Sequence, residues 1–441
     1  MLYIIALFLL VFQAALLFRT PFNAFPEHYL FPWLILLGKV PYRDFFDHHG
    51  LFIYYVLAPV IYDRSLLALQ MVYVFIQLVS TVIFILILKR TSRWMEVGFA
   101  ALLYVLSVYV LIGNTTWYDT WIAMFALLVF YLLFKKPSYG IDFAIGTAIA
   151  VAALVKPPSG LILIPSLIKR RSPLVVISFT LTIAGVLLYL FANGVLQQAI
   201  DQLVLFNLHY VRVVRSIGAN GIPHIFIVVG MFALVWFIFS VIKYWTLISS
   251  LSWCAGLFAL CLSLPLISSP TTVSLIPVVP FVLIAAFSLV RVHQPFVRTA
   301  FYICTLIFLI LFFKEARFQY KQYVRGGRYV DNTTTQKIVS DLRALALPRG
   351  SFFIFANHPE VYYLLNSPPP IRFTFIFPWI DSYYNLTQQL SYDLEKHAVR
   401  YVYLPVGSDP VLSVSNLKRT ISSYQVVKKG RGYVLYERKN K

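Results

Sequence analysis

Long runs of apolar residues dominate the pattern of this chain, and its polar residues are confined to short stretches between them. Apolar runs of about 17 to 22 residues are long enough to cross a hydrocarbon core of about 30 Å as α-helices. Lipid permits only helices or closed barrels, and these runs lack the alternation of a barrel strand. The pattern therefore predicts a polytopic α-helical membrane protein.

We predict about eleven transmembrane helices from this pattern. They cover residues 2–18, 66–88, 97–112, 121–134, 141–155, 159–168, 173–192, 222–242, 246–264, 275–290 and 297–313. The segments 141–155 and 159–168 are short for full crossings, so a hairpin of two tilted half-length helices is the alternative for them. The first run has no basic segment before it and no small-residue cleavage site after it, which favours a retained helix over a secretory signal.

The pattern changes after Phe313, where the remaining chain reads as a water-soluble domain of about 110 residues. Its predicted helices are Asn332 to Leu345, Glu360 to Leu365 and Ser382 to His397, and its predicted strands are Ser351 to Phe355 and Val399 to Leu404. A hairpin of Tyr424 to Val427 and Tyr433 to Tyr436 surrounds the Gly430-Arg431-Gly432 turn. We therefore divide the chain into a transmembrane domain, 1–318, and a small C-terminal α/β domain, 319–441.

Two of the segments between the predicted spans are long, 19–65 and 193–221. In the first, two sets of residues have the i, i+3, i+4, i+7 spacing of one helix face: Leu30, Trp33, Leu34 and Leu37, and then Leu51, Tyr54, Tyr55 and Ala58. This spacing predicts two amphipathic helices that lie in the membrane interface with one face in lipid. They would hold the acidic stretch between them at headgroup depth.

Composition agrees with the membrane assignment. The chain is 60% hydrophobic and 12% charged, with a mean hydropathy of +0.77, which is far outside the range of soluble domains. The net charge of +20 would suggest a nucleic-acid partner in a soluble protein, but the basic residues collect in short loops between apolar runs, so we expect no nucleic acid. All three cysteines lie inside apolar runs and provide no disulfide framework or zinc motif.

The distribution of charge predicts the orientation of the chain. With Met1 in the cytoplasm, the inside loops contain Lys89, Arg90, Arg93, Lys135, Lys136, Lys169, Arg170, Arg171, Lys243, Arg291 and Arg298. The short outside loops contain only Lys156, whereas the acids Glu27, Asp44, Asp47, Asp63, Asp119 and Asp201 all fall outside. The excess of basic residues marks the cytoplasmic side, so the C-terminal domain is predicted to be extracytoplasmic.

The acids of the first outer segment are candidate functional groups. Glu27 starts the first amphipathic helix, where it is either a first-turn acid favoured by the helix dipole or a carboxylate with a chemical role. For Asp44 a salt bridge with Arg43 or Lys39 is the favoured interpretation. Asp47 precedes His48 and His49, so a metal site is conceivable. Adjacent histidines on an extended backbone point opposite ways, so at most one of them would serve.

Three further groups could carry chemistry. Asp119 stands at the start of the fourth span, where a carboxylate is costly unless it is paired or faces a wet cavity, and helix capping by Asp119 or Thr120 is the competing interpretation. Lys156 either extends its ammonium to lipid headgroups or binds one particular phosphate as a point charge. Arg212 and Arg215 could add anion contacts, and a solvated basic face explains them equally well.

The order of these residues resembles the polyprenyl-phosphate-dependent glycosyltransferases of the GT-C superfamily, specifically the bacterial relatives of protein mannosyltransferases and of the aminoarabinose transferase of lipid A. The resemblance rests on Glu27-His28-Tyr29, Gly38 to Asp44, His49-Gly50-Leu51, Asp119, Lys156 and the C-terminal stretch from Ala356 to Tyr363 followed by Ser367 to Arg372. Two departures stand out. The family's first motif begins Asp-Glu where this chain has Pro26-Glu27, and Ser268 to Thr272 lacks the Arg or His-Tyr of many members.

The resemblance implies a bacterial inner-membrane enzyme of the cell envelope that moves a sugar from a polyprenyl-phosphate donor to a lipid, glycan or protein acceptor at the external face, with inversion. It implies Glu27 as the first choice for general base or acceptor-positioning residue, with Asp119 and Asp47 next. It implies Lys156, Tyr42, Asp44, His49, Arg212 and Arg215 as substrate-binding residues. A divalent metal ion at Glu27, Asp47 and His49 is compatible with this mechanism but not required by it.

Two other functions stay open from the sequence. A flippase or transporter of lipid-linked saccharides would work beside the same bilayer, although transporters tend to carry charges mid-membrane and paired repeats. A polymerase or ligase of surface polysaccharide would use the same lipid donors and would rely on outer-loop arginines such as Arg212 and Arg215.

Overall fold

The computed structural model describes residues 1–90, 92–112, 114–217, 250–268, 272–290, 332–405, 421–430 and 432–439. The chain forms two compact units. The first contains Met1–Asn23, Gln70–Leu188 and Gly218–Arg325, and the second contains Ala24–Leu69, Tyr189–Ile217 and Gly326–Lys441. The predicted division at 318/319 put the two long outer segments with the membrane part, whereas the structure groups most of both with the C-terminal residues.

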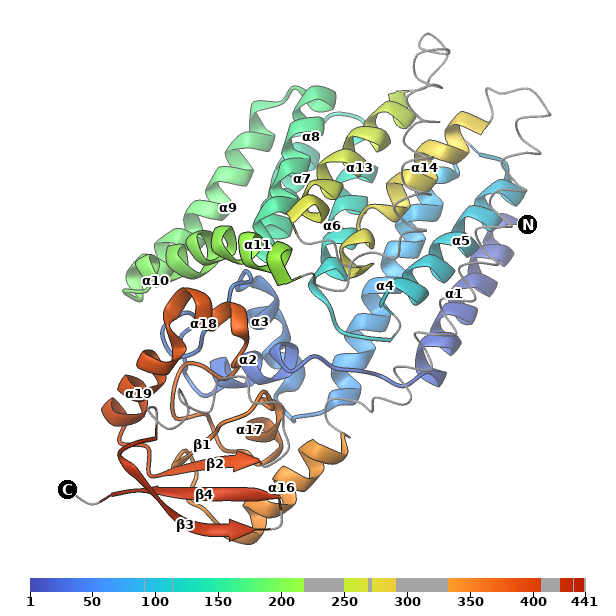
Figure 1. The fold of residues 1–441 in the computed structure, drawn as a ribbon. Coiled ribbons are helices and arrows are strands. Elements are labelled where there is room, and N and C mark those ends of the chain that lie inside the picture. The colour runs from blue at the N-terminus through green and yellow to red at the C-terminus, as the bar shows by residue number, and fades with distance from the viewer. Residues whose placement is uncertain are drawn as a thin grey trace. The chain divides into compact units, whose positions relative to one another are not determined.

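The first unit is built from apolar helices (Figure 1). They are α1 (Leu2–Arg19), α4 (Leu66–Leu88), α5 (Trp94–Ile112), α6 (Tyr118–Leu133), α7 (Tyr139–Val155), α8 (Leu163–Arg170), α9 (Pro173–Ala192), α13 (Ser250–Ser268) and α14 (Val279–Val290), with short 3-10 turns η2 (Pro157–Ile162) and η4 (Thr272–Leu275). The last turn of α9 and the first of α4 belong to the second unit.

Four helices among the described residues, α1, α4, α5 and α9, are long and apolar enough to cross a membrane. Together with the shorter apolar helices they make the chain a multi-pass membrane protein. The helices agree closely with the predicted spans, since 66–88 matches α4 and 173–192 matches α9. The predicted spans 222–242 and 297–313 lie outside the described residues, so the total of eleven stays a prediction.

The predicted span 159–168 is wrong as a single helix. Helix α7 ends at Val155, and η2 and the eight-residue helix α8 follow it. Pro157 and Pro158 have no backbone N–H, and a residue before proline avoids the helical region, so Lys156 takes an extended backbone and α7 ends there. At 1.5 Å per residue, α8 is too short to cross a bilayer.

The second unit combines helices with a four-stranded sheet. Its helices are α2 (Glu27–Leu36), α3 (Phe52–Leu57), α10 (Leu196–Ile200), α11 (Phe206–Ile217), α16 (Thr333–Leu345), α17 (Glu360–Leu364), α18 (Pro378–Tyr384) and α19 (Leu386–Lys396), with the 3-10 turn η1 (Pro59–Ile61) and the π-helical turn η3 (Asp201–Leu205). Its strands are β1 (Phe352–Ile354), β2 (Tyr401–Pro405), β3 (Tyr424–Gly430) and β4 (Tyr433–Arg438).

The sheet has the order β1-β2-β4-β3 (Figure 1). Strands β1 and β2 are parallel, and β4 pairs antiparallel with both β2 and β3. The predicted strands and hairpin are confirmed, and the Asn332 side chain caps α16 by accepting a hydrogen bond from the Thr334 amide. The predicted helix from Ser382 to His397 is wrong as a single element, because Asn385 takes a left-handed backbone (φ +49°) that separates α18 from α19.

Helix α2 forms where the sequence predicts a helix, but its predicted lipid-facing side is wrong. Every residue from His28 to Leu34 is buried. Tyr29 and Trp33 pack against the ring of Tyr363 on α17, with ring centroids 4.8 and 5.7 Å apart. The predicted face is therefore buried at Leu30, Trp33 and Leu34, and only Leu37 at its end is exposed, at 44%. Helix α3 has only six residues, and Ile53, Tyr54 and Leu57 are buried as well.

Candidate functional site

Asp47 is the centre of a polar cluster in the second unit. Its side chain is only 2% exposed, in the loop between α2 and α3. The carboxylate accepts hydrogen bonds from the Tyr54 hydroxyl and from the His48 amide at 2.8 Å, and Nδ1 of His49 lies 3.0 Å from Asp47 Oδ1. Burial raises the pKa of Asp47 to about 6, against the opposing effects of the charge of His48 and the hydrogen bond from Tyr54.

The two histidines after Asp47 lie on the same side of the loop. Their ring centroids are 4.1 Å apart, and one ligand atom from each of Asp47, His48 and His49 lies within 4.8 Å of the others. The prediction that they point opposite ways is wrong, because the backbone bends at His48 and His49 and is not extended there. One carboxylate and two imidazoles are a ligand set that suits a divalent ion. Among the described residues, Glu27 does not belong to this group.

The loop that carries the cluster is held by the π-helical turn η3 and by α11. Gln202 accepts a hydrogen bond from the Asp47 amide at 3.0 Å and donates one to the Tyr42 carbonyl at 2.7 Å. Asn207 donates to the His48 carbonyl at 2.8 Å. Tyr42 is fully buried with φ +70°, and its hydroxyl donates to the His49 carbonyl at 3.0 Å. In this structure Tyr42 therefore shapes the loop, and its predicted substrate contact stays a prediction.

Asp44 makes the predicted salt bridge with Arg43, at 3.1 Å. It also accepts a hydrogen bond from the Val40 amide at 2.7 Å, which closes the turn. The predicted salt bridge of Asp44 with Arg43 is therefore confirmed, and its predicted substrate contact stays a prediction.

We expect Asp47→Asn to lower the free energy of unfolding by about 2 to 3 kcal/mol, because one carboxylate oxygen that accepts hydrogen bonds becomes an NH₂ that faces donors. This corresponds to a fall of about 5 °C in the apparent melting temperature of detergent-solubilised protein. The matched control is Asp63→Asn, an exposed acid near η1, for which we expect no measurable change. Equal melting temperatures for the two variants would contradict the arrangement around Asp47.

In the first unit, Asp119 and Lys156 form an ion pair. Lys156 Nζ lies 3.3 Å from Asp119 Oδ1 and 3.4 Å from Oδ2. The Asp119 side chain is 3% exposed and that of Lys156 is 27% exposed. Asp119 lies in the first turn of α6 without capping it, since the N-cap residue is Trp117. The burial of Asp119 is therefore compensated by pairing, as the sequence argument required.

Asp119 and Lys156 are both candidate residues from the sequence, but their contact with each other was not predicted. The signal was present, because α6 and α7 are consecutive helices joined by a short loop and must run antiparallel. An acid in the first turn of α6 and a cation just after the last turn of α7 consequently meet at the same end of the helix pair.

Asp201 makes a further side-chain contact, part-buried, that could not be predicted from the sequence. Its carboxylate accepts hydrogen bonds from the hydroxyls of Tyr383, at 2.7 Å, and of Tyr384. Burial, together with the hydrogen bond to Asp201, raises the pKa of Tyr383 to about 12. These bonds tie η3 to α18. The available signal was a lone acid in an apolar outer segment and a pair of adjacent tyrosines far along the chain.

The other predicted site residues are Glu27, Arg212 and Arg215. Glu27 lies in the first turn of α2 and is half-buried. Arg212 is exposed on α11. Arg215 belongs to the same helix, but its side chain lies outside the described part.

No family model and no curated protein matches this sequence. Solved structures match over most of the chain. ArnT from Cupriavidus metallidurans, bound to undecaprenyl phosphate, is 12% identical with a TM-score of 0.55, over 99% of this chain and 97% of that one. The archaeal oligosaccharyltransferase AglB from Archaeoglobus fulgidus, in complex with an inhibitory peptide and a dolichol-phosphate, is 11% identical with a TM-score of 0.52, over 91% of this chain and 69% of that one.

A further structure of the Archaeoglobus fulgidus oligosaccharyltransferase, a complex with Zn and sulfate, is 12% identical with a TM-score of 0.54, over 98% of this chain and 73% of that one. At these identities the likeness concerns the fold. The chain has the GT-C fold of these proteins.

Proposed function

We propose that this protein is a membrane glycosyltransferase that transfers a sugar from a polyprenyl-phosphate-linked donor to an acceptor at the external membrane face, with inversion. The observation that carries the proposal is the ion pair of Asp119 and Lys156. A partly exposed ammonium, fixed by a buried carboxylate at the end of apolar helices, is suited to a phosphate whose lipid stays in the bilayer. The shared fold with proteins solved with undecaprenyl phosphate and dolichol-phosphate supports the same reading.

In the proposed reaction the acceptor oxygen attacks the anomeric carbon, and the bond between that carbon and the phosphate oxygen breaks. The acceptor proton passes to a carboxylate, for which Glu27 is our first candidate. Polyprenyl phosphate leaves with the bonding electron pair, and Lys156 stabilises its negative charge. Asp119 holds the ammonium of Lys156 in place.

The ligand set of Asp47, His48 and His49 fits a divalent ion. When bound, such an ion supplies positive charge that can stabilise a phosphate oxygen. Without it, Asp47 fixes the orientation of His49, which then provides a polar contact for substrate.

The function is tested by transfer of a radiolabelled sugar from synthetic polyprenyl-phosphate donors in membranes that contain the protein. Transfer with stoichiometric release of polyprenyl phosphate is the expected result. Movement of the intact lipid-linked donor across liposomes without that release would instead identify a flippase. Formation of long saccharide chains from lipid-linked repeat units would identify a polymerase.

We further propose that the N-terminus is cytoplasmic and that the C-terminal domain is extracytoplasmic, in the bacterial inner membrane. A cysteine at the exposed position Glu395, in a background with the three native cysteines replaced by serine, should react with a membrane-impermeant maleimide in intact spheroplasts. A cysteine at the exposed position Lys135 in the same background is the control and should react only after lysis. The opposite pattern would invert the topology and remove the proposed external site.

A further inference from the structure

The segment after α9 has two different faces. Val195, Ala199, Gln202 and Phe206 are buried, at spacings of three or four residues. On the other side Ile200, Val204 and Leu208 are 46%, 48% and 61% exposed, at spacings of four. A stripe of large apolar side chains thus faces outward along α10, η3 and α11. We call Ile200, Val204 and Leu208 the apolar stripe.

Contacts on the buried face fix the rotation of these helices and keep the apolar stripe on the outside. Gln202 and Asn207 hold the loop around Asp47 through the hydrogen bonds described above. Phe206 packs against the rings of Phe46 and Tyr384, with centroids 5.2 and 5.9 Å apart. These contacts fix the rotation of the helices, so the stripe stays exposed.

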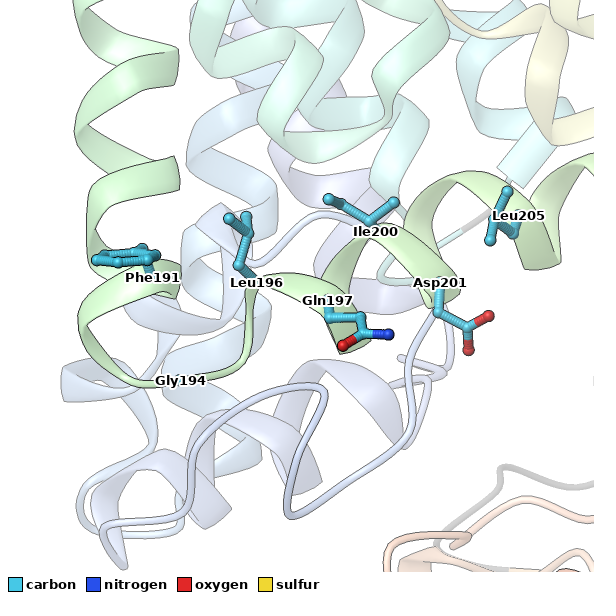
Figure 2. A pocket seen from close by; sticks show the side chains of 7 residues that line it. All are labelled: Phe191, Gly194, Leu196, Gln197, Ile200, Asp201 and Leu205. Carbon is cyan, nitrogen blue, oxygen red and sulfur yellow. The ribbon is translucent and has the colours of Figure 1, made fainter.

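A groove continues the apolar surface toward α9. It has a volume of about 540 Å³ and is lined by Phe191, Gly194, Leu196, Gln197, Ile200, Asp201 and Leu205. Figure 2 shows Leu196, Ile200 and Leu205 on one side of the segment and Gln197 and Asp201 on the other. The carboxylate of Asp201 accepts hydrogen bonds from Tyr383 and Tyr384 on the polar side. None of the lining residues on the apolar side is acidic.

The neighbouring elements indicate what covers this surface. Among the described residues, α9 is one of four helices suited to cross a membrane, and only 17% of its apolar stretch is buried. Its last turn contains Phe191, which is 70% exposed. Gly194, with φ +65°, turns the chain directly from α9 into α10. Arg212, exposed one turn beyond Leu208, provides a cation at the end of the stripe. An apolar stripe that follows a span and ends in arginine is the pattern of a helix in the bilayer interface.

We propose that Phe191, the apolar stripe and Arg212 form a membrane-contact surface whose occupant is bilayer lipid, with acyl chains on the apolar side chains and a phosphate group on Arg212. Through Gln202 and Asn207 this contact sets the depth of the Asp47 loop at the membrane surface. This proposal builds on the proposed function, because it gives the Asp47 loop a fixed depth at the membrane surface. The lipid contact itself does not depend on glycosyl transfer.

The test measures depth in nanodiscs of phosphatidylcholine and phosphatidylglycerol. Single cysteines at Val204 and Leu208, in the cysteine-free background, carry an environment-sensitive fluorophore, and a cysteine at the exposed position Gln388 on α19 is the control. We expect lipids with a shallow spin label to quench the fluorophores at 204 and 208 at least threefold more than the one at 388. Aqueous iodide should quench them in the opposite order. Equal access of iodide to all three positions would overturn the proposal.

A second measurement separates lipid contact from transfer. Leu208→Asp should move the fluorophore at 204 toward water and lower sugar transfer several-fold, whereas Leu208→Met should change neither. If no transfer is found for any donor but the depth pattern holds, the proposed function fails and the lipid contact stands. Normal depth at 204 in Leu208→Asp would overturn the contact.

Discussion

Replacing Lys156 by alanine is expected to lower kcat for sugar transfer by about 100- to 1,000-fold, the usual effect of removing one group that stabilises developing negative charge. The ammonium is proposed to stabilise the leaving phosphate, so the effect falls mainly on kcat. Lys156→Arg keeps the charge but not the compact geometry and should give an intermediate rate. The control is Lys169→Ala, an exposed lysine on α8, which should stay within twofold of wild type.

Lys156→Ala also leaves the buried carboxylate of Asp119 without its cation, so lost folding must be separated from lost chemistry. The double variant Lys156→Met with Asp119→Leu removes both charges together and should regain the apparent melting temperature of wild type. It should remain as inactive as Lys156→Ala. A double variant that is stable and active would contradict the role of Lys156.

The second large effect is expected for Glu27→Gln, with kcat about 100- to 10,000-fold lower and KM nearly unchanged, because glutamine has the shape of glutamate but accepts no proton. Glu27 is half-buried at the start of α2, so the substitution should not alter the fold. Glu395→Gln, at an exposed position, is the control. Radiolabelled transfer under single-turnover conditions measures the chemical step.

If Glu27→Gln keeps full activity, the proton acceptor is a different group. Asp119→Asn and Asp47→Asn then identify it by their rates, provided that each is corrected for the stability it loses. Asp119 is the weaker candidate in this structure, since its carboxylate is buried and already paired with Lys156.

Much of the fold could be predicted from the sequence, because the lengths of the apolar runs and the local capping and turn residues determine where helices and strands begin and end. Helix α4 begins and ends where its apolar run does, and the cap at Asn332 and the turn after Gly430 mark elements of the C-terminal domain. Helix α2 shows the limit. Its spacing predicts a helix with one apolar and one polar face, but every residue from His28 to Leu34 is buried, and the packing partner Tyr363 lies far away in sequence.

For the candidate site, the residue types were predictable from the sequence but their contact partners were not. The residue types of Asp47, Asp119 and Lys156 were recognisable, since charge beside a membrane demands a partner. The partners themselves depend on packing. Gln202 could not be linked to the Asp47 loop from the sequence, because an amide side chain between apolar residues gives no signal of its contacts, and the bend that brings His48 and His49 together has no local signature.

The π-helical turn η3 has a consequence for how this protein tolerates change. The Phe206 amide donates to the Asp201 carbonyl, five residues back instead of four, so the helix contains one extra residue at this point. The extra residue changes the rotation of α11 relative to α10. With this rotation Asp201 contacts Tyr383 and Tyr384, and Phe206 and Asn207 contact the Asp47 loop. Loss of a single residue here would turn α11 by about 100° relative to α10.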